Sequence, residues 1–331
     1  MIYNAEEGLA AIMFPVEEVD VFAETEPGRR DRIAAKKAII NMDTRAVLSV
    51  VGRQYGLLEN RRALELAKKC CTAAFPNTAP AGWHVDDIEA PVTGGHCRID
   101  LRYDGNVVAY DWSFSEAVQD HYHPFLRVTN SYNTSRVFSI HFGFTRIQCM
   151  NSVIAEESVK VSLAHTRNIE RRIEKEINQA KFQKVANRFE TYVKALGNTG
   201  IPRGRFRTII QSALEIHRPK GMPDDRQASW RALEQILDKT IDVYLQRFGE
   251  TAYALLNAIT DIATRPPTKE QVGYSFIRRE RHSLQLLAGR WVAEFSRSLR
   301  RPGFDLSGYL REPSAVRLNA RNGKRIRGYR R

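Results

Sequence analysis

Apolar and polar residues alternate strictly over much of the stretch from 96 to 149, which is the pattern of half-buried β-strands. The first run places four apolar side chains on one face, Cys97, Ile99, Leu101 and Tyr103. A turn at 104–106 leads to a return strand whose apolar face is Val108, Tyr110, Trp112 and Phe114. Two more strands follow at 124–130 and 136–149, and the last one carries Phe138, Ile140, Phe142 and Phe144 on one face. The pattern predicts a four-stranded antiparallel meander, which a strand near residue 48 would extend.

Helical spacing of apolar residues appears on both sides of this sheet. Before it, Asn60 is placed to cap a helix over 61–75. After it, an apolar stripe from Ile169 to Leu196 predicts one long helix over 155–196, capped by Asn151-Ser152 and roughly 60 Å long at about 1.5 Å per residue. The same spacing predicts further helices over 203–216, 224–248, 250–263 and 269–299.

These elements predict an α+β protein: an antiparallel β-meander with a packed helix, followed by an all-helical half with one long helix. The expected organisation has four parts. They are an acidic then basic N-terminal arm (1–45), an α+β sheet domain (46–154), a helical domain (155–296) and a basic flexible tail (297–331). The arm is interpreted as a solubilising, partly ordered terminus.

Length and cysteine usage narrow the class of protein. A chain of 331 residues is long enough for one large domain or two modest ones. No apolar run approaches the ~18 residues of a membrane helix, and the N-terminus lacks a secretory pattern. Four cysteines without a CxxC motif fit reduced thiols. We therefore expect a cytoplasmic, nucleoid-associated protein without a membrane partner.

The charge distribution points to a polyanionic partner. The net charge is +13, and the charges are segregated along the chain. Residues 1–28 hold seven acids and no base, whereas residues 297–331 hold eleven bases and two acids. Such a basic tail can lie along phosphates, and Tyr309 and Tyr329 can stack on bases. The tail residues proposed to bind nucleic acid are Arg321, Lys324, Arg325, Arg327 and Arg330.

A second group of bases lies on the predicted sheet. Arg98 and Arg102 share the polar face of one strand, and Arg127, Arg136 and Arg146 lie on or at the ends of the next two. A basic sheet face is a common platform for single-stranded nucleic acid. The alternative is a solvated face whose charges serve solubility. Arg278 and Arg279, in the run IRRERH, are further bases that favour nucleic-acid binding over the solvated alternative.

Residues for catalysis are sparse. There is no GxxxxGK[ST] and no GxGxxG after a strand, so nucleotide hydrolysis has no support and no cofactor is expected. His121 and His123 form an HxH next to an acid, with His141 on a neighbouring strand, and they are weak candidates for a metal site. Surface histidines are the alternative. Cys149 is interpreted as a buried apolar residue rather than a nucleophile.

A set of motif residues is spread over roughly residues 46–265: Tyr55, Asn60, Asn130, Ser131, Ser135, Arg146, Cys149, Asn151, Asn257 and Thr260. These motifs resemble those of the phage- and plasmid-like family of the domain of unknown function 932. Members of the family usually carry an acidic-Gly turn where this chain has Tyr132-Asn133-Thr134. The resemblance implies a mobile-element setting and brings no catalytic residue. The order of sheet and helix is also loosely similar to that of single-strand annealing proteins.

The leading hypothesis is a phage- or plasmid-encoded protein that binds nucleic acid, single-stranded DNA above all, in annealing, recombination or replication without ATP hydrolysis. Self-association is a further expectation. One alternative is a structural or host-interaction protein of a mobile element, for example an anti-defence protein. Another is a metal-dependent nuclease, and the sequence favours a protein that is not an enzyme.

Overall fold

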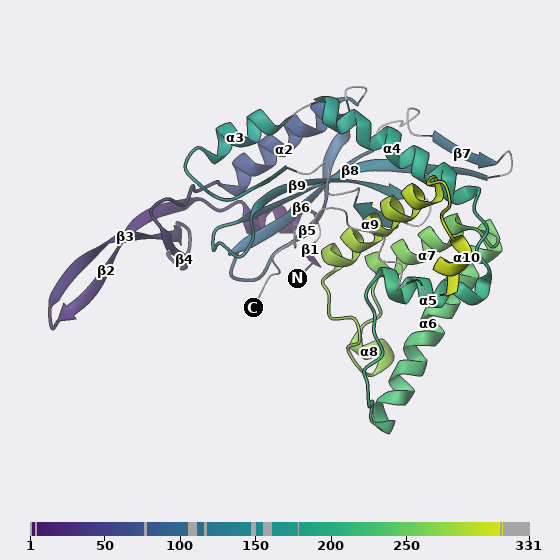
Figure 1. Cartoon of the computed structure of the whole chain (residues 1–331). Coiled ribbons are helices and arrows are strands. Elements are labelled where there is room, and N and C mark those ends of the chain that lie inside the picture. The colour runs from purple at the N-terminus through teal and green to yellow at the C-terminus, as the bar shows by residue number, and fades with distance from the viewer. Residues whose placement is uncertain are drawn as a thin grey trace. The chain divides into compact units, whose positions relative to one another are not determined.

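The computed structural model describes residues 2–3, 5–75, 78–104, 111–115, 118–146, 150–154, 161–177, 179–311 and 313. The chain forms two compact units (Figure 1). Unit 1 comprises Met1–Ser113, Gln119–Gln148 and Glu157–Ala186. Unit 2 comprises Phe114–Val118, Cys149–Glu156 and Asn187–Arg331.

Unit 1 is built on an antiparallel sheet, which confirms the α+β class. Its strands run in the order β1 (Ile2–Tyr3), β5 (Trp83–Glu89), β6 (His96–Tyr103), β8 (Val118–Ser131) and β9 (Phe138–Arg146). The strand β7 (Asp111–Ser115) pairs with β8, and β11 (Val161–Leu163) pairs with β9. The predicted hairpin partner of β6 was therefore wrong, because β6 pairs directly with β8, and β7, within the expected return strand, pairs with β8 as well. The strand β5 was not predicted from the sequence.

Both faces of this sheet are buried along β9, where all nine residues are shielded from solvent. One face carries the predicted apolar alternation, including Phe138 and Phe142. The helix α2 (Asn60–Ala74) contacts β6, and its buried side includes Leu66 and Cys70. Helix α2 begins at Asn60, so the predicted N-cap is one residue off; Glu59 holds that position. Unit 1 also contains α1 (Ala5–Ile12), η1 (Pro80–Gly82), α3 (Ile169–Glu176) and the first part of α4 (Gln179–Gly197).

The predicted N-terminal arm contains a long β-ribbon. It consists of β2 (Val16–Glu26) and β3 (Arg29–Asn41), which project from the rest of unit 1 (Figure 1). Acids of β2 face bases of β3 across the ribbon, as in the register pair of Glu24 with Arg30. The strand β4 (Val47–Gly52) pairs with β3, so the strand expected near residue 48 joins this separate three-stranded sheet.

Unit 2 is helical apart from β10 (Ser152–Ile154). Its helices are the end of α4 (Gln179–Gly197), α5 (Arg203–Ala213), α6 (Asp224–Phe248), α7 (Ala252–Thr264), α8 (Lys269–Val272), α9 (Arg281–Leu299) and α10 (Leu306–Arg311). Helix α7 is the centre of the core and packs against α6, α9 and β10. Gly289 of α9 lies so close to β10 that a Cβ there would be 1.7 Å from the carbonyl oxygen of Ile154. In the part of the chain that the structure describes, no helix is long and apolar enough to cross a membrane.

Two predicted helices and one predicted cap were wrong. Within the described residues 161–177 and 179–196, the predicted long helix is divided into β11, α3 and α4. Asn151-Ser152 does not cap it, because Ser152 begins β10. The helix over 269–299 is interrupted between α8 and α9, where Gly273 has a left-handed backbone (φ 82°). A Cβ at Gly273 would also be 2.8 Å from the hydroxyl of Ser229, so this break fits glycine best.

Candidate nucleic-acid interface

Three of the five arginines predicted on the sheet, Arg98, Arg102 and Arg127, are paired with carboxylates in unit 1. The guanidinium of Arg127 donates to both carboxylate oxygens of Asp100, from Nε at 2.6 Å and from Nη2 at 2.5 Å. Burial works against the charge of Arg127, but the pairing with Asp100 keeps its pKa above the ordinary value. Arg98 donates to Glu89 at 2.8 Å.

Arg102 lies on the same face and forms an ion pair with Asp86 at 3.1 Å, and burial raises the pKa of that carboxyl. Arg98 and Arg127 are only 4% and 3% exposed, and Arg146 is 1% exposed. Arg136 is half-buried before β9. Phosphate binding by this sheet face therefore gains no support from the geometry.

Four of the family-motif residues of unit 1, Tyr55, Asn60, Asn130 and Ser131, form a buried polar cluster between the sheet and α2. The side-chain amide of Asn130 donates to the carbonyl oxygen of Leu58 and to Oδ1 of Asn60, both at 2.8 Å. The hydroxyl of Tyr55 donates to the carbonyl oxygen of Ser131. Because these side chains bind backbone and one another, they hold the loop before α2 in place.

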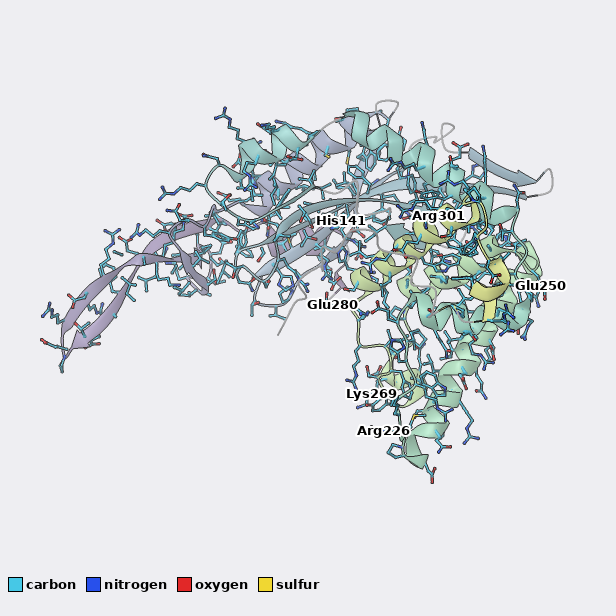
Figure 2. All side chains as sticks on the ribbon, in the orientation of Figure 1. His141, Arg226, Glu250, Lys269, Glu280 and Arg301 are labelled. Carbon is cyan, nitrogen blue, oxygen red and sulfur yellow. The ribbon has the colours of Figure 1, made fainter. Side chains whose placement is uncertain are left out.

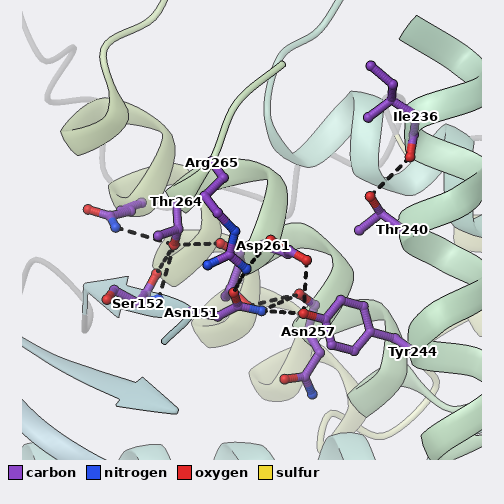
Figure 3. A network of polar contacts seen from close by, with 11 residues as sticks. Asn151, Ser152, Ile236, Thr240, Tyr244, Asn257, Asp261, Thr264 and Arg265 are labelled. Carbon is purple, nitrogen blue, oxygen red and sulfur yellow. Dashed lines mark hydrogen bonds and ion pairs between the residues drawn. The ribbon is translucent and has the colours of Figure 1, made fainter. Parts of the chain in front are cut away.

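The later motif residues form a second network, in unit 2 (Figure 3). The amide of Asn151 donates to the hydroxyl of Tyr244 at 2.6 Å and to the carbonyl oxygen of Asn257 at 3.3 Å. The guanidinium of Arg265 donates to Oδ1 of Asn151 at 2.6 Å and to Asp261. The Tyr244 hydroxyl donates in turn to Asp261 at 2.9 Å. Since Asn151 and Asn257 are 2% and 1% exposed, this network ties β10 to α6 and α7 rather than facing a ligand.

An open pocket of about 470 Å³ lies elsewhere in unit 2. It is formed by two loops, one after α5 and one between α8 and α9. Its lining residues are Glu215, His217, Pro219, Tyr274, Ser275, Phe276, Arg278 and Arg279. Two residues proposed from the sequence, Arg278 and Arg279, therefore lie together in a cavity of the size that ligand sites usually have.

Aromatic rings and guanidinium groups are interleaved at this pocket. The guanidinium carbon of Arg226, near the start of α6 (Figure 2), lies 4.6 Å from the ring centre of Tyr274. Nη2 of Arg278 donates to the hydroxyl of the same tyrosine at 3.3 Å. Phe276 packs against Tyr274 with ring centres 4.8 Å apart and against Trp230 with ring centres 5.1 Å apart. The buried Trp230 thus anchors an aromatic platform that two arginines flank.

Arg279 forms an ion pair with Glu215 across the pocket. Glu215 follows the C-terminus of α5 and has a left-handed backbone, with φ at 53°. The N–H of Ile216 donates to the carbonyl oxygen of Gln211 at 2.8 Å, which is the hydrogen bond expected where a helix ends in a left-handed residue. Glycine usually holds that position, because a side chain there strains the backbone. The carboxylate of Glu215 therefore occupies a strained position at which it holds a cation of the pocket.

Other predicted residues lie apart from this pocket or outside the described residues. Nδ1 of His123 is 2.6 Å from the carbonyl oxygen of Tyr103. Within the described ranges, no three His, Cys, Asp or Glu side chains are grouped as a metal site requires, so His121 and His123 gain no support as ligands. Cys149, Tyr329 and the five proposed tail residues lie outside the described residues.

The start of the expected flexible tail is folded. Helix α9 extends to Leu299 and α10 follows. Tyr309 is 4% exposed, and its hydroxyl accepts a hydrogen bond from Nε1 of Trp291 at 2.8 Å. The prediction that Tyr309 stacks on bases was wrong, because its ring is part of the core of unit 2.

The fold and the pocket define an α+β protein of two units with an arginine-rich aromatic cavity in its helical unit. The profile of the family described as Domain of unknown function (DUF932) matches residues 47–285. The chain belongs to that family. No curated protein and no solved structure gave a match in the same comparisons.

Proposed function

We propose that this protein binds single-stranded nucleic acid, with DNA as the favoured form, through the pocket of unit 2 and the basic C-terminal segment. Binding without nucleotide hydrolysis suits a protein that assists annealing in recombination or replication. The resemblance of the motifs makes a phage or plasmid the proposed setting, and the bacterial cytoplasm, near the nucleoid, the proposed location.

The observation that carries this proposal is the placement of Arg226 and Arg278 around the ring of Tyr274. Stacking of an unpaired base on an aromatic ring contributes about 1–3 kcal/mol and tolerates any base. Arginine neutralises phosphates, and its planar guanidinium can also stack. Arg218 and Lys220, on the loop that forms one wall, are exposed and make no ion pair with another described residue. The pocket thus offers the two contacts that single-stranded nucleic acid requires.

A salt-titrated binding assay with single- and double-stranded oligonucleotides tests the proposal. We expect the single strand to bind more tightly, with an affinity that falls as salt rises. Arg278→Gln should weaken binding at every salt concentration. It should also reduce the slope of log affinity against log salt concentration by about 0.7 for each phosphate that the variant no longer neutralises. Arg205→Gln is the matched control, since Arg205 is an exposed base of α5 outside the pocket lining. An equal reduction of affinity in both variants, or binding that ignores salt, would count against the pocket.

The β-ribbon favours a second candidate, a structural or host-interaction protein. Its outer part is exposed on both strands and carries exposed apolar side chains, among them Phe22 at 55% and Ile33 at 37% exposure. Exposed ribbon edges are ready templates for pairing with another chain. Light scattering with and without oligonucleotide separates the two candidates, because an assembly that forms without DNA and ignores it favours the second.

A further inference from the structure

A second pocket, in unit 1, is independent of the proposed nucleic-acid interface. It encloses about 330 Å³ at the base of the β-ribbon. Its walls come from β2, β3, the loop between β4 and α2, and the loop before α3. The lining residues are Glu18, Lys37, Arg53, Tyr55, Gly56, Leu57 and Arg167. Three cations and one carboxylate therefore surround the cavity.

Lys37 is the buried cation of this pocket, with a side chain that is 11% exposed. Its ammonium group lies 2.7 Å from Oε1 of Glu18 and donates to the carbonyl oxygen of Tyr55 at 2.8 Å. An ammonium group carries three N–H donors, so these two contacts leave one for a ligand.

Arg53 is held from the outside of the pocket. Its Nε donates to the carbonyl oxygen of Ala34 at 2.7 Å, and Nη2 donates to Asp20 at 2.5 Å. Asp20 also accepts from Arg32 at 2.7 Å, and the two guanidinium groups lower the pKa of its carboxyl. One carboxylate thus serves two arginines, so it neutralises the charge of Arg53 only in part, and the Nη1 donors of Arg53 stay available.

The loop that carries Arg167 is fixed against the pocket wall. The N–H of Gly56 donates to the carbonyl oxygen of His165 at 3.1 Å, and the rings of Tyr55 and His165 stack with centres 5.0 Å apart. A Cβ at Gly56 would be 2.1 Å from the carbonyl oxygen of Thr166, so the two backbones meet as closely as glycine permits. The guanidinium of Arg172 donates to the Thr166 hydroxyl at 2.7 Å.

Arg167 itself is exposed and forms no ion pair with any residue that the structure describes. A rigid backbone therefore presents an uncompensated guanidinium at the mouth of a cavity that holds a buried ammonium group. Pre-organised cations of this kind bind oxyanions, because little conformational entropy remains to be lost on binding.

We propose that this pocket binds a phosphate group through Arg167, Lys37 and Arg53. A tetrahedral oxyanion presents acceptors in several directions at once, which matches donors supplied by three separate elements. The group comes either from free phosphate or from the terminal phosphate of a nucleic-acid strand, since both present the same chemistry.

Hydrogen–deuterium exchange of the full-length protein tests the site and locates it. Inorganic phosphate is added to one sample and chloride at equal ionic strength to the other. We expect slower exchange in peptides that cover 54–58 and 164–168. The pocket of unit 2 is reported separately by peptides that cover 215–220 and 274–280, so protection there alone overturns this proposal.

Two variants and two oligonucleotides complete the test. Arg167→Gln should weaken phosphate binding, measured by protection at 54–58, about tenfold, which is the effect of removing one charge-assisted hydrogen bond. Arg171→Gln should leave phosphate binding unchanged, because Arg171 is an exposed residue of α3 outside the pocket lining. Strands with and without a 5′-phosphate then separate the sources: protection by the phosphorylated strand alone assigns the strand end, and protection by inorganic phosphate alone assigns the free anion. Absence of protection with every probe, or equal weakening in both variants, refutes the site.

Discussion

Glu215→Gln tests whether the pocket of unit 2 contains its own competitor for phosphate. In the wild type, the Glu215 carboxylate holds Arg279 and places a negative charge where a phosphate would bind. A like charge about 4 Å away costs about 1 kcal/mol in water, which corresponds to roughly fivefold in affinity. We therefore expect Glu215→Gln to bind single-stranded DNA about fivefold more tightly. Since Arg279 is released to neutralise a phosphate, the slope of log affinity against log salt concentration should also steepen by about 0.7.

Glu215→Gly extends the same test to the backbone. Relief of the left-handed conformation gains about 1–2 kcal/mol. Added backbone freedom costs about 0.5–1 kcal/mol and removal of the ion pair about 0.2–1 kcal/mol. The free energy of unfolding should therefore stay within about 1 kcal/mol of wild type, while binding tightens as in Glu215→Gln.

Fluorescence anisotropy over a range of salt concentrations measures the binding, and urea unfolding measures the stability. Glu190→Gln is the matched control. Glu190 pairs with Lys194 at 2.6 Å on α4, so its removal also raises the net charge by one and releases a base. If both Glu215 variants bind no more tightly than this control, the carboxylate does not compete with phosphate and the reasoning fails.

Three further predictions concern stability. Burial lowers the pKa of His165 to about 4. The neutral ring therefore contributes fully to the free energy of unfolding above the unfolded pKa of about 6.5, and this contribution is lost as the pH falls toward 4. Urea unfolding should show that the free energy of unfolding decreases by about 2 kcal/mol between pH 7 and 5, and His165→Phe should abolish this decrease. Gly289→Ala should lower the melting temperature sharply because its Cβ meets a backbone carbonyl, whereas Gly204→Ala, in open space on α5, should raise it slightly. Asp100→Asn should cost about 3–5 kcal/mol of unfolding free energy by leaving buried Arg127 without its anion; a decrease below about 1 kcal/mol would contradict that pairing.

Elements with strong local signals were predictable from the sequence. Helix α6 runs from Asp224 to Phe248 as expected, because acids mark its start and Gly249 its end. The alternation of β9 identified the strand. It did not show that the opposite face is also buried, since residues such as His141 and Thr145 are polar. Burial of polar side chains depends on partners that only the tertiary fold supplies.

Pairing between distant strands explains what the sequence could not show. Arg127 lies beside Asp100 because β6 pairs directly with β8, and no single strand's pattern contains that register. The pocket of unit 2 was not predicted for a different reason: residues 273–280 were expected to be helical, whereas they form the loop between α8 and α9. The run Gly273 to Phe276 does contain a signal, a glycine followed by two aromatic residues without a helical stripe.

Photo-cross-linking locates a bound single strand on the protein. A single-stranded oligonucleotide with a photoreactive thymidine analogue is bound to the full-length protein and irradiated, and the attached peptides are identified by mass spectrometry. If the strand binds at the pocket of unit 2, cross-links form within 274–279 and disappear in Tyr274→Ala, while that variant still unfolds cooperatively. Cross-links confined to β5, β6 and β8, or none within 274–279, would contradict it.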